Sequence, residues 1–311
     1  MKRNITDLLV FTAIGLVLAA YFASGWLAAP ADGPWLTSGL PAMLTILLCS
    51  IPLYFIHQWM LPGASVVTAL FYVFLAPANP ISFCFSPFHG VALLSAASLY
   101  CYLCYTALRP ALKYAAGLWV SFGFAVQFLP SLLWMAPVLL LSSIGNATDK
   151  GKYCFTALLG LLLPPVIGMV LRYLISGTVP SSGFFPGFWS EMVTLQMPSA
   201  NLPFATLFRL SFTVVLTVTA ILHILPHLSR FRIVQYRAVV RLLLLTLCLS
   251  VYAFLFLHYP AQPAGLLVML PVAPLLSVFM LQTISRKSAG YWLTILLLLL
   301  AVERISFFVN L

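Results

Sequence analysis

Apolar runs dominate the chain, and each is separated from the next by proline, glycine or charged residues. Because an α-helix rises about 1.5 Å per residue, about 20 apolar residues cross the hydrocarbon layer of a bilayer. The pattern therefore predicts eleven transmembrane helices, at residues 8–28, 40–57, 63–77, 88–107, 114–128, 131–145, 153–176, 203–225, 238–258, 264–284 and 289–309.

The composition excludes an ordinary soluble domain. Hydrophobic residues make up 63% of the 311 residues, and the mean hydropathy is +1.09. A soluble protein of this length has too little interior to remove so much apolar surface from water. We therefore expect an all-α, polytopic transmembrane helical bundle in which residues 1–311 form a single integral membrane domain.

Three of the expected spans, 63–77, 114–128 and 131–145, are each nearer to 15 residues than to the ~20 that a straight crossing needs. The two that flank Pro130 are also compatible with a re-entrant hairpin, which gives nine crossings. The first apolar stretch is longer than the roughly 7–15 residues of a signal-peptide core, so a retained first helix is favoured over a cleaved signal.

Basic residues predict the orientation. The chain has 15 Lys+Arg but only 5 Asp+Glu. If the N-terminus is cytoplasmic, the N-terminal segment and the connections on that side carry twelve of the fifteen basic residues, and the opposite connections carry none. This asymmetry follows the positive-inside rule. It places the C-terminus on the extracytoplasmic side. The basic residues on the cytoplasmic side are Lys2, Arg3, Arg109, Lys113, Lys150, Lys152, Arg230, Arg232, Arg237, Arg241, Arg286 and Lys287.

The densest basic segment is "RFRIVQYRAVVR", part of an expected cytoplasmic basic loop at 226–241. If residues 230–241 are helical, Arg230, Arg237 and Arg241 lie on one stripe. Such a stripe suits anionic lipid headgroups, and a protein partner is the alternative. No nucleic-acid partner is expected, because single-strand binding needs a polar groove with stacking aromatic residues.

Five charged residues do not fit the topology pattern. Arg172, Arg209 and Arg304 are predicted in the outer part of their spans, Glu303 lies at the level of Arg304, and Glu191 lies in the outer loop 177–202. Charges inside a membrane usually pair or line a pathway, and arginine suits phosphate and carboxylate. We expect an anion or lipid-phosphate site near the outer leaflet. The alternative is snorkelling arginines or structural Arg–Glu pairs.

The outer loop 177–202 contains "SSGFFPGFWSEM", whose aromatic residues predict an interfacial segment. His89 and His258 are also predicted at outer ends of spans. Several spans contain proline, and "LPVAPLL" at 270–276 is the best candidate for a discontinuous helix of the kind that forms transporter sites.

Sequence signatures of catalysis are missing: there is no Walker A, HExxH or Gly-x-Ser-x-Gly motif. Asp32 is placed like an acidic residue of membrane glycosyltransferases, but between proline and glycine it is typical of a turn. Cys101 and Cys104 form a C-x-x-C within an apolar run, which favours packing over metal binding. We expect no cofactor and no metal.

Over about residues 60–176 the chain resembles a known family. The segments are "LPGASVVTALFYVFLAPANP", "KYAAGLWVSFGFAVQFLPSLLWMAPVLLL" and "ALLGLLLPPVIGMVLRYLISG". Their order resembles an uncharacterised family of bacterial multi-pass inner-membrane proteins, the DUF6427 family. The resemblance implies a bacterial inner-membrane location and supplies no activity.

Three functions follow from these features. A transport or cell-envelope role is favoured, with a lipid-phosphate or other anion site near the outer leaflet. The first alternative is an enzyme that acts on a lipid-linked, polyprenyl-phosphate glycan. The second is a non-catalytic scaffold in an envelope assembly, and the balance leans against an enzyme.

Overall fold

A computed structural model describes residues 39–61, 65–77, 82, 84–176, 204–257 and 264–283, together with 291, 292, 294, 295, 298 and 302. These residues form an all-α structure, which confirms the predicted class. The nine α-helices within them are α2 (Gly39–Met60), α3 (Ser65–Leu75), α4 (Pro87–Leu103), α5 (Leu112–Phe128), α6 (Ala136–Ile144), α7 (Lys150–Ser176), α9 (Phe204–His227), α10 (Ile233–Phe256) and α11 (Gly265–Val278).

Four shorter helical turns extend or link these helices. Two are π-helical turns, η2 (Cys104–Leu108) after α4 and η5 (Phe279–Thr283) after α11. Two are 3₁₀ turns, η3 (Pro130–Met135) before α6 and η4 (Leu228–Arg230) after α9.

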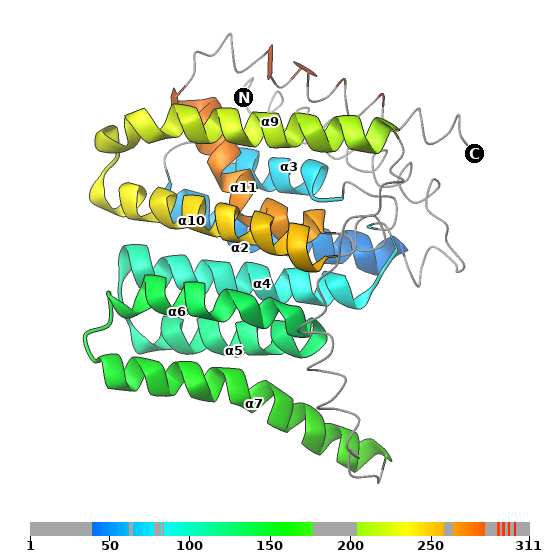
Figure 1. Ribbon diagram of the computed structural model, residues 1–311, viewed down its shortest axis with the longest axis vertical. Helices are drawn as coiled ribbons and strands as arrows, with labels where there is room; N and C mark the ends of the chain where they lie inside the picture. Colours follow the sequence, from blue (N-terminus) through cyan, green and yellow to red (C-terminus); the bar gives the residue numbers. More distant parts are fainter. Residues whose placement is uncertain are drawn as a thin grey trace, which may run out of the picture.

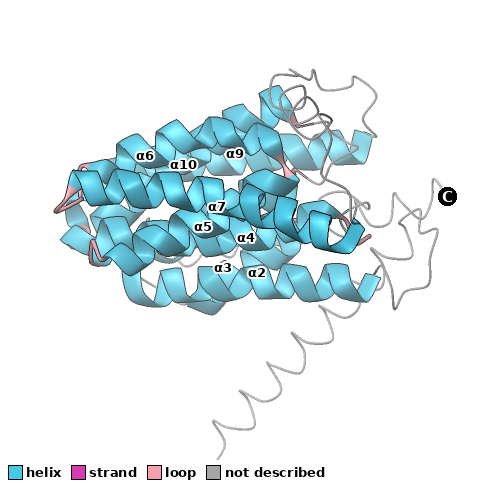
Figure 2. Ribbon diagram, turned by 90° about the horizontal axis from the view of Figure 1, so that it is seen from below, coloured by secondary structure: helices cyan, strands magenta, loops and turns pink. Residues whose placement is uncertain are grey.

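The helices form an up-and-down bundle in which successive helices run in opposite directions (Figure 1). Helix α7 lies at the lower edge of this view and α9 at the upper edge, with α5, α4 and α10 between them. Helix α5 packs against both α4 and α7, whereas α11 packs against α10, α3, α4 and α9. The view in Figure 2 shows the long helices side by side along a shared direction.

Nine of the eleven expected spans coincide with the nine described helices, and 8–28 and most of 289–309 lie outside the described residues. Five helical segments are long and apolar enough to cross a membrane, not eleven, when only the described residues are considered. These five are Gly39–Met60, Pro87–Leu108, Lys150–Gly168, Ser211–Arg230 and Ile233–Phe256.

The count of eleven is corrected because α3, α5, α6 and α11 have 11, 17, 9 and 14 residues, fewer than the ~20 of a straight crossing. An apolar run also has two physical causes. A helix can be apolar because lipid surrounds it or because other helices do. Helix α11 belongs to the second kind. Apart from its first residue, Gly265, and Val268, every residue of α11 is buried, including Pro271 and Pro274. The helix also runs through both prolines without a break, so the predicted discontinuity at 270–276 is absent.

Glycine residues bring α5 and α7 into close contact. A Cβ atom added to Gly160 of α7 would lie 2.5 Å from the Cβ of Trp119 in α5. One added to Gly123 of α5 would overlap the Gly160 carbonyl oxygen and lie 2.9 Å from Cγ of Pro164. The two backbones therefore approach closely only because neither glycine has a side chain.

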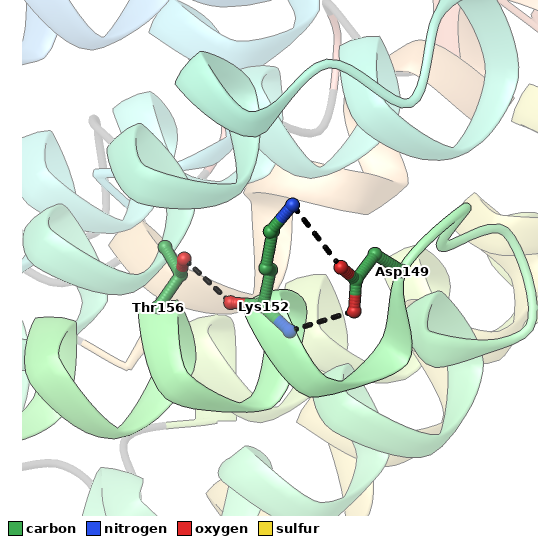
Figure 3. A network of polar contacts seen from close by, with 3 residues as sticks. All are labelled: Asp149, Lys152 and Thr156. Atoms are coloured by element: carbon green, nitrogen blue, oxygen red, sulfur yellow. Dashed lines mark hydrogen bonds and ion pairs between the residues drawn. The ribbon is translucent and has the colours of Figure 1, made fainter.

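Asp149 caps the start of α7. Its Oδ1 accepts a hydrogen bond of 3.1 Å from the Lys152 backbone N–H, and its Oδ2 lies 3.3 Å from the Lys152 ammonium (Figure 3). One turn further along, the Thr156 hydroxyl donates a hydrogen bond of 2.8 Å to the Lys152 carbonyl oxygen. The backbone hydrogen bond from Lys152, aided by its ammonium group, lowers the pKa of Asp149 below its usual range.

The predicted arginine stripe is only partly correct. Arg230 ends the 3₁₀ turn η4, Arg232 has an extended backbone, and α10 begins only at Ile233. The helix assumed over 230–241 is therefore interrupted, and Arg230 is not on its face. Arg237 and Arg241, four residues apart in α10, do share a face.

Candidate functional site

The residues of the predicted outer anion site lie largely outside the described part of the structure. Glu191, Glu303 and Arg304 belong to segments that are not described. Arg172 lies in α7 and Arg209 in α9, but their side chains are not described either. The convergence of these five residues at one site therefore stays a prediction.

His89, near the start of α4, uses both ring nitrogens in hydrogen bonds within the protein. Its Nδ1 accepts a hydrogen bond of 3.2 Å from the Ser86 backbone N–H. Its Nε2 lies 2.9 Å from the Ser82 carbonyl oxygen, an acceptor, so Nε2 carries the proton. The buried imidazole thus ties the segment before α4 to the helix and has no nitrogen left for a ligand. His258, the other predicted histidine, lies outside the described residues.

A cavity of about 50 Å³ lies between α4, α5, η3, α6, α10 and α11. Its walls are apolar except for two serine side chains of α4. The lining residues are Ser95, Ser98, Leu99, Phe122, Leu132, Met135, Leu139, Leu245, Leu249, Leu267, Leu270 and Pro271.

The cavity contains polar groups without the usual partners. The Ser95 hydroxyl oxygen is buried and has no hydrogen-bond partner. On the opposite wall, Pro271 has no N–H to offer the Leu267 carbonyl, and Pro274 has none for the Leu270 carbonyl. Both leucines line the cavity. An unpaired hydroxyl therefore shares a small apolar space with residues whose carbonyl groups lack their normal helical donors.

The cavity lies in one half of the bundle. Ser95 is eight residues into α4, about 12 Å from its start at Pro87, and Leu249 is seven residues, about 10 Å, from the end of α10. These helix ends lie opposite the turns that carry Arg109, Lys150 and Arg230 (Figure 1). We call the end with those turns the basic end.

No lining residue is charged, so the cavity suits a small uncharged solute with a hydrogen-bonding group rather than an anion. One wall of the cavity includes part of the segment "LPVAPLL", which the sequence indicated as a candidate site. There was no such signal for Ser95 or Ser98, because a serine in an apolar helix is usually bonded to its own backbone.

A second polar cluster lies near the basic end and joins four helices. Trp119 donates from Nε1 to the Tyr153 hydroxyl at 3.0 Å, and that hydroxyl also bonds to Ser143. The ring of Tyr105, in the π-helical turn η2, stacks on Tyr153 with centroids 5.1 Å apart. The Tyr102 hydroxyl donates to Ser142 at 2.8 Å.

In comparisons with known proteins, no family model, no functionally characterised protein and no solved structure matches the chain. Among the described residues, no three His, Cys, Asp or Glu side chains are close enough together to hold a metal ion. Cys101 and Cys104 form no disulfide. The cavity is therefore the feature from which a function can be inferred.

Proposed function

We propose that this multi-pass membrane protein transports a small uncharged solute, and that the cavity beside α11 is its binding site. Five long apolar helices imply contact with a lipid bilayer. One observation carries the proposal of transport: the unpaired Ser95 hydroxyl lies in a cavity that is also lined by Leu267 and Leu270, the residues whose carbonyls the α11 prolines deprive of donors. Transporters commonly bind solutes and ions at backbone carbonyls that lack helical donors, and in α11 the prolines produce such carbonyls although the helix is continuous.

The proposed orientation places the basic end in the cytoplasm. Basic residues in three separate turns, among them Arg109, Lys150 and Arg230, gather at that end (Figure 1). In membrane proteins such an excess marks the cytoplasmic side. The cavity then lies in the outer half of the membrane. A bacterial cytoplasmic membrane is the location that the sequence resemblance implies, and it stays a prediction because no family model matches the chain.

The described residues favour transport over the two alternatives. A scaffold should contain buried ion pairs that lock its helices, but the ion pair found within the described ranges, Asp149–Lys152, is on the surface. An enzyme on a lipid-linked glycan needs acidic groups at its site, and the cavity lining has none. Asp32 and Glu191, the acidic candidates for such chemistry, belong to segments outside the described ranges.

Accessibility of the cavity to water tests the proposal. In a cysteine-free variant of the full chain, Ser95→Cys is treated in membranes with a small methanethiosulfonate reagent. The matched control is Ala96→Cys, the next residue of α4, which is fully buried and does not line the cavity. A transport site must open to water, and thiols react as thiolates, so the cysteine at 95 should react about tenfold faster than the one at 96.

The side of the membrane from which the reagent reaches the cysteine at 95 distinguishes a transport site from a closed cavity. Reagent added from either face of the membrane should reach the cysteine at 95 if the site opens alternately to both sides. Equal, slow reaction at 95 and 96 would show a closed packing defect and would refute the transport proposal. Reporter fusions in the turns at 146–152 and 226–232 test the orientation independently, and both should report a cytoplasmic position.

A further inference from the structure

Arg241 differs from the other arginines at the basic end. Arg230, Arg232 and Arg237 are exposed, whereas Arg241 is partly buried. It is the ninth residue of α10, so its Cα lies about 12 Å along the helix from Ile233. An arginine at this level of a membrane helix is costly unless its charge is compensated.

The contact that the structure gives for Arg241 among the described residues is with a neutral group. Its guanidinium interacts with the Tyr102 hydroxyl of α4. Tyr102 donates its own proton to Ser142 of α6, and Ser142 donates in turn to the Leu139 carbonyl at 3.2 Å. The Tyr102 oxygen can therefore only accept from Arg241. This chain of hydrogen bonds leaves the Tyr102 oxygen as an acceptor for the guanidinium, and no ion pair joins Arg241 to a carboxylate within the described ranges.

We infer that Arg241 and Arg237 hold the phosphate of an anionic phospholipid at the basic end. Arg237 lies one helical turn nearer the start of α10 and on the same face, so the two side chains can reach one phosphate group. A guanidinium fork that Tyr102 holds on one side still has donors for phosphate oxygens on the other.

Exposed apolar side chains on α6 and α10 suit the rest of a lipid. Leu141 of α6, beside Ser142, is 74% exposed, and Ile233 at the start of α10 is 72% exposed. Side chains so exposed at the ends of membrane helices contact acyl chains or headgroups. A lipid bound here supplies both a negative charge for the arginines and apolar contact, whereas a free phosphate ion supplies the charge alone.

The binding of short-chain phosphatidylglycerol to the purified full chain in neutral detergent tests this inference. Thermal unfolding is followed as the lipid is added, because a ligand that binds only the folded state raises the melting temperature. Phosphatidylglycerol should raise it, whereas phosphatidylcholine and inorganic phosphate at the same concentrations should not. Equal shifts with phosphatidylcholine, or with inorganic phosphate alone, would overturn the lipid-phosphate assignment.

Variants locate the site. Arg241→Gln should remove the selective shift, and Arg241→Lys should retain part of it. Arg237→Gln, at an exposed position that poses no risk to folding, should raise the phosphatidylglycerol concentration for half-maximal shift about fivefold, as expected for one basic residue near a lipid surface. The matched control Arg230→Gln should behave like the wild type. An unchanged response in Arg237→Gln, or a loss as large in Arg230→Gln, would refute the site. The cavity plays no part in this test, so its result is independent of the proposed transport.

Discussion

Helices α11 and α7 share two sequence features but lie in opposite environments. Both are strongly apolar, and each contains two prolines, Pro271 and Pro274 in α11 and Pro164 and Pro165 in α7. Helix α11 is surrounded by α3, α4, α9 and α10 and is buried on almost every side. Helix α7 packs mainly against α5 at the edge of the bundle (Figure 1).

The difference shows two ways of holding a helix in a membrane. Lipid is as apolar as leucine, so burial in protein adds stability through close packing rather than through removal from water. Side chains on all faces provide that packing for α11. For α7 the packing comes from one contact surface with α5, which we call the seam. There Gly123 and Gly160 let the two backbones approach closely. The rest of α7 exposes large side chains such as Leu162 and Val166.

The largest difference should come from truncating a leucine in each helix. Leu276 of α11 is 0% exposed and Leu162 of α7 is 54% exposed. Leu276→Ala should leave a cavity and lower the free energy of unfolding by about 2–5 kcal/mol. Leu162→Ala should change it by less than about 0.5 kcal/mol, because lipid fills the space. Unfolding in mixed micelles with rising denaturing detergent measures both. Equal losses would mean that α7 is covered by protein.

The seam should be broken by a small side chain in the right place. Gly160→Val should lower stability by about 1–3 kcal/mol, because its Cβ would collide with Trp119. Gly145→Ala is the control, since nothing lies within 4 Å of the added atom. Protease sensitivity of the connection between α6 and α7 should rise only in Gly160→Val. If both variants match the wild type, α7 is not held by this seam.

Replacing a proline in α11 should affect both stability and the cavity, whereas replacing one in α7 should affect stability alone. Pro271→Ala gives the Leu267 carbonyl a donor and should raise stability by roughly 1 kcal/mol, less than the ~3 kcal/mol of a soluble helix. It should also slow modification of a cysteine at 95. Pro165→Ala, in the partly exposed face of α7, should stabilise similarly without changing that rate. A slower rate in both variants would show a general loss of flexibility.

Much of the architecture could be predicted from the sequence, because apolar runs and their punctuation reflect helix length directly. Nine expected spans match described helices. The environment of each helix could not be predicted, since α11 and α7 are both apolar runs with two prolines and the tertiary packing decides which of them is buried. The interruption before Ile233 also escaped prediction, because arginine is compatible both with a helix and with the extended backbone of Arg232.

The candidate site was less predictable than the fold. The proline pair at 271 and 274 was visible as a feature of one helix, but the cavity depends on where α4 and α10 pack against it. Arg241 was expected to share a stripe with Arg230. Its distinct role follows from Tyr102 and Ser142, which are far from it in sequence and adjacent only in the folded chain.

The smallest effect should come from the cap of α7 at Asp149. Its pKa is lowered in the folded chain, so its contribution to stability is present above the ordinary carboxyl pKa of about 3.9 and is lost as pH falls through the lower folded value. Acid should therefore loosen the start of α7, as amide hydrogen exchange near Lys152 would show. Asp149→Asn should remove this pH dependence, because an amide does not titrate in this range. A wild-type response that persisted in Asp149→Asn would have to come from another carboxylate.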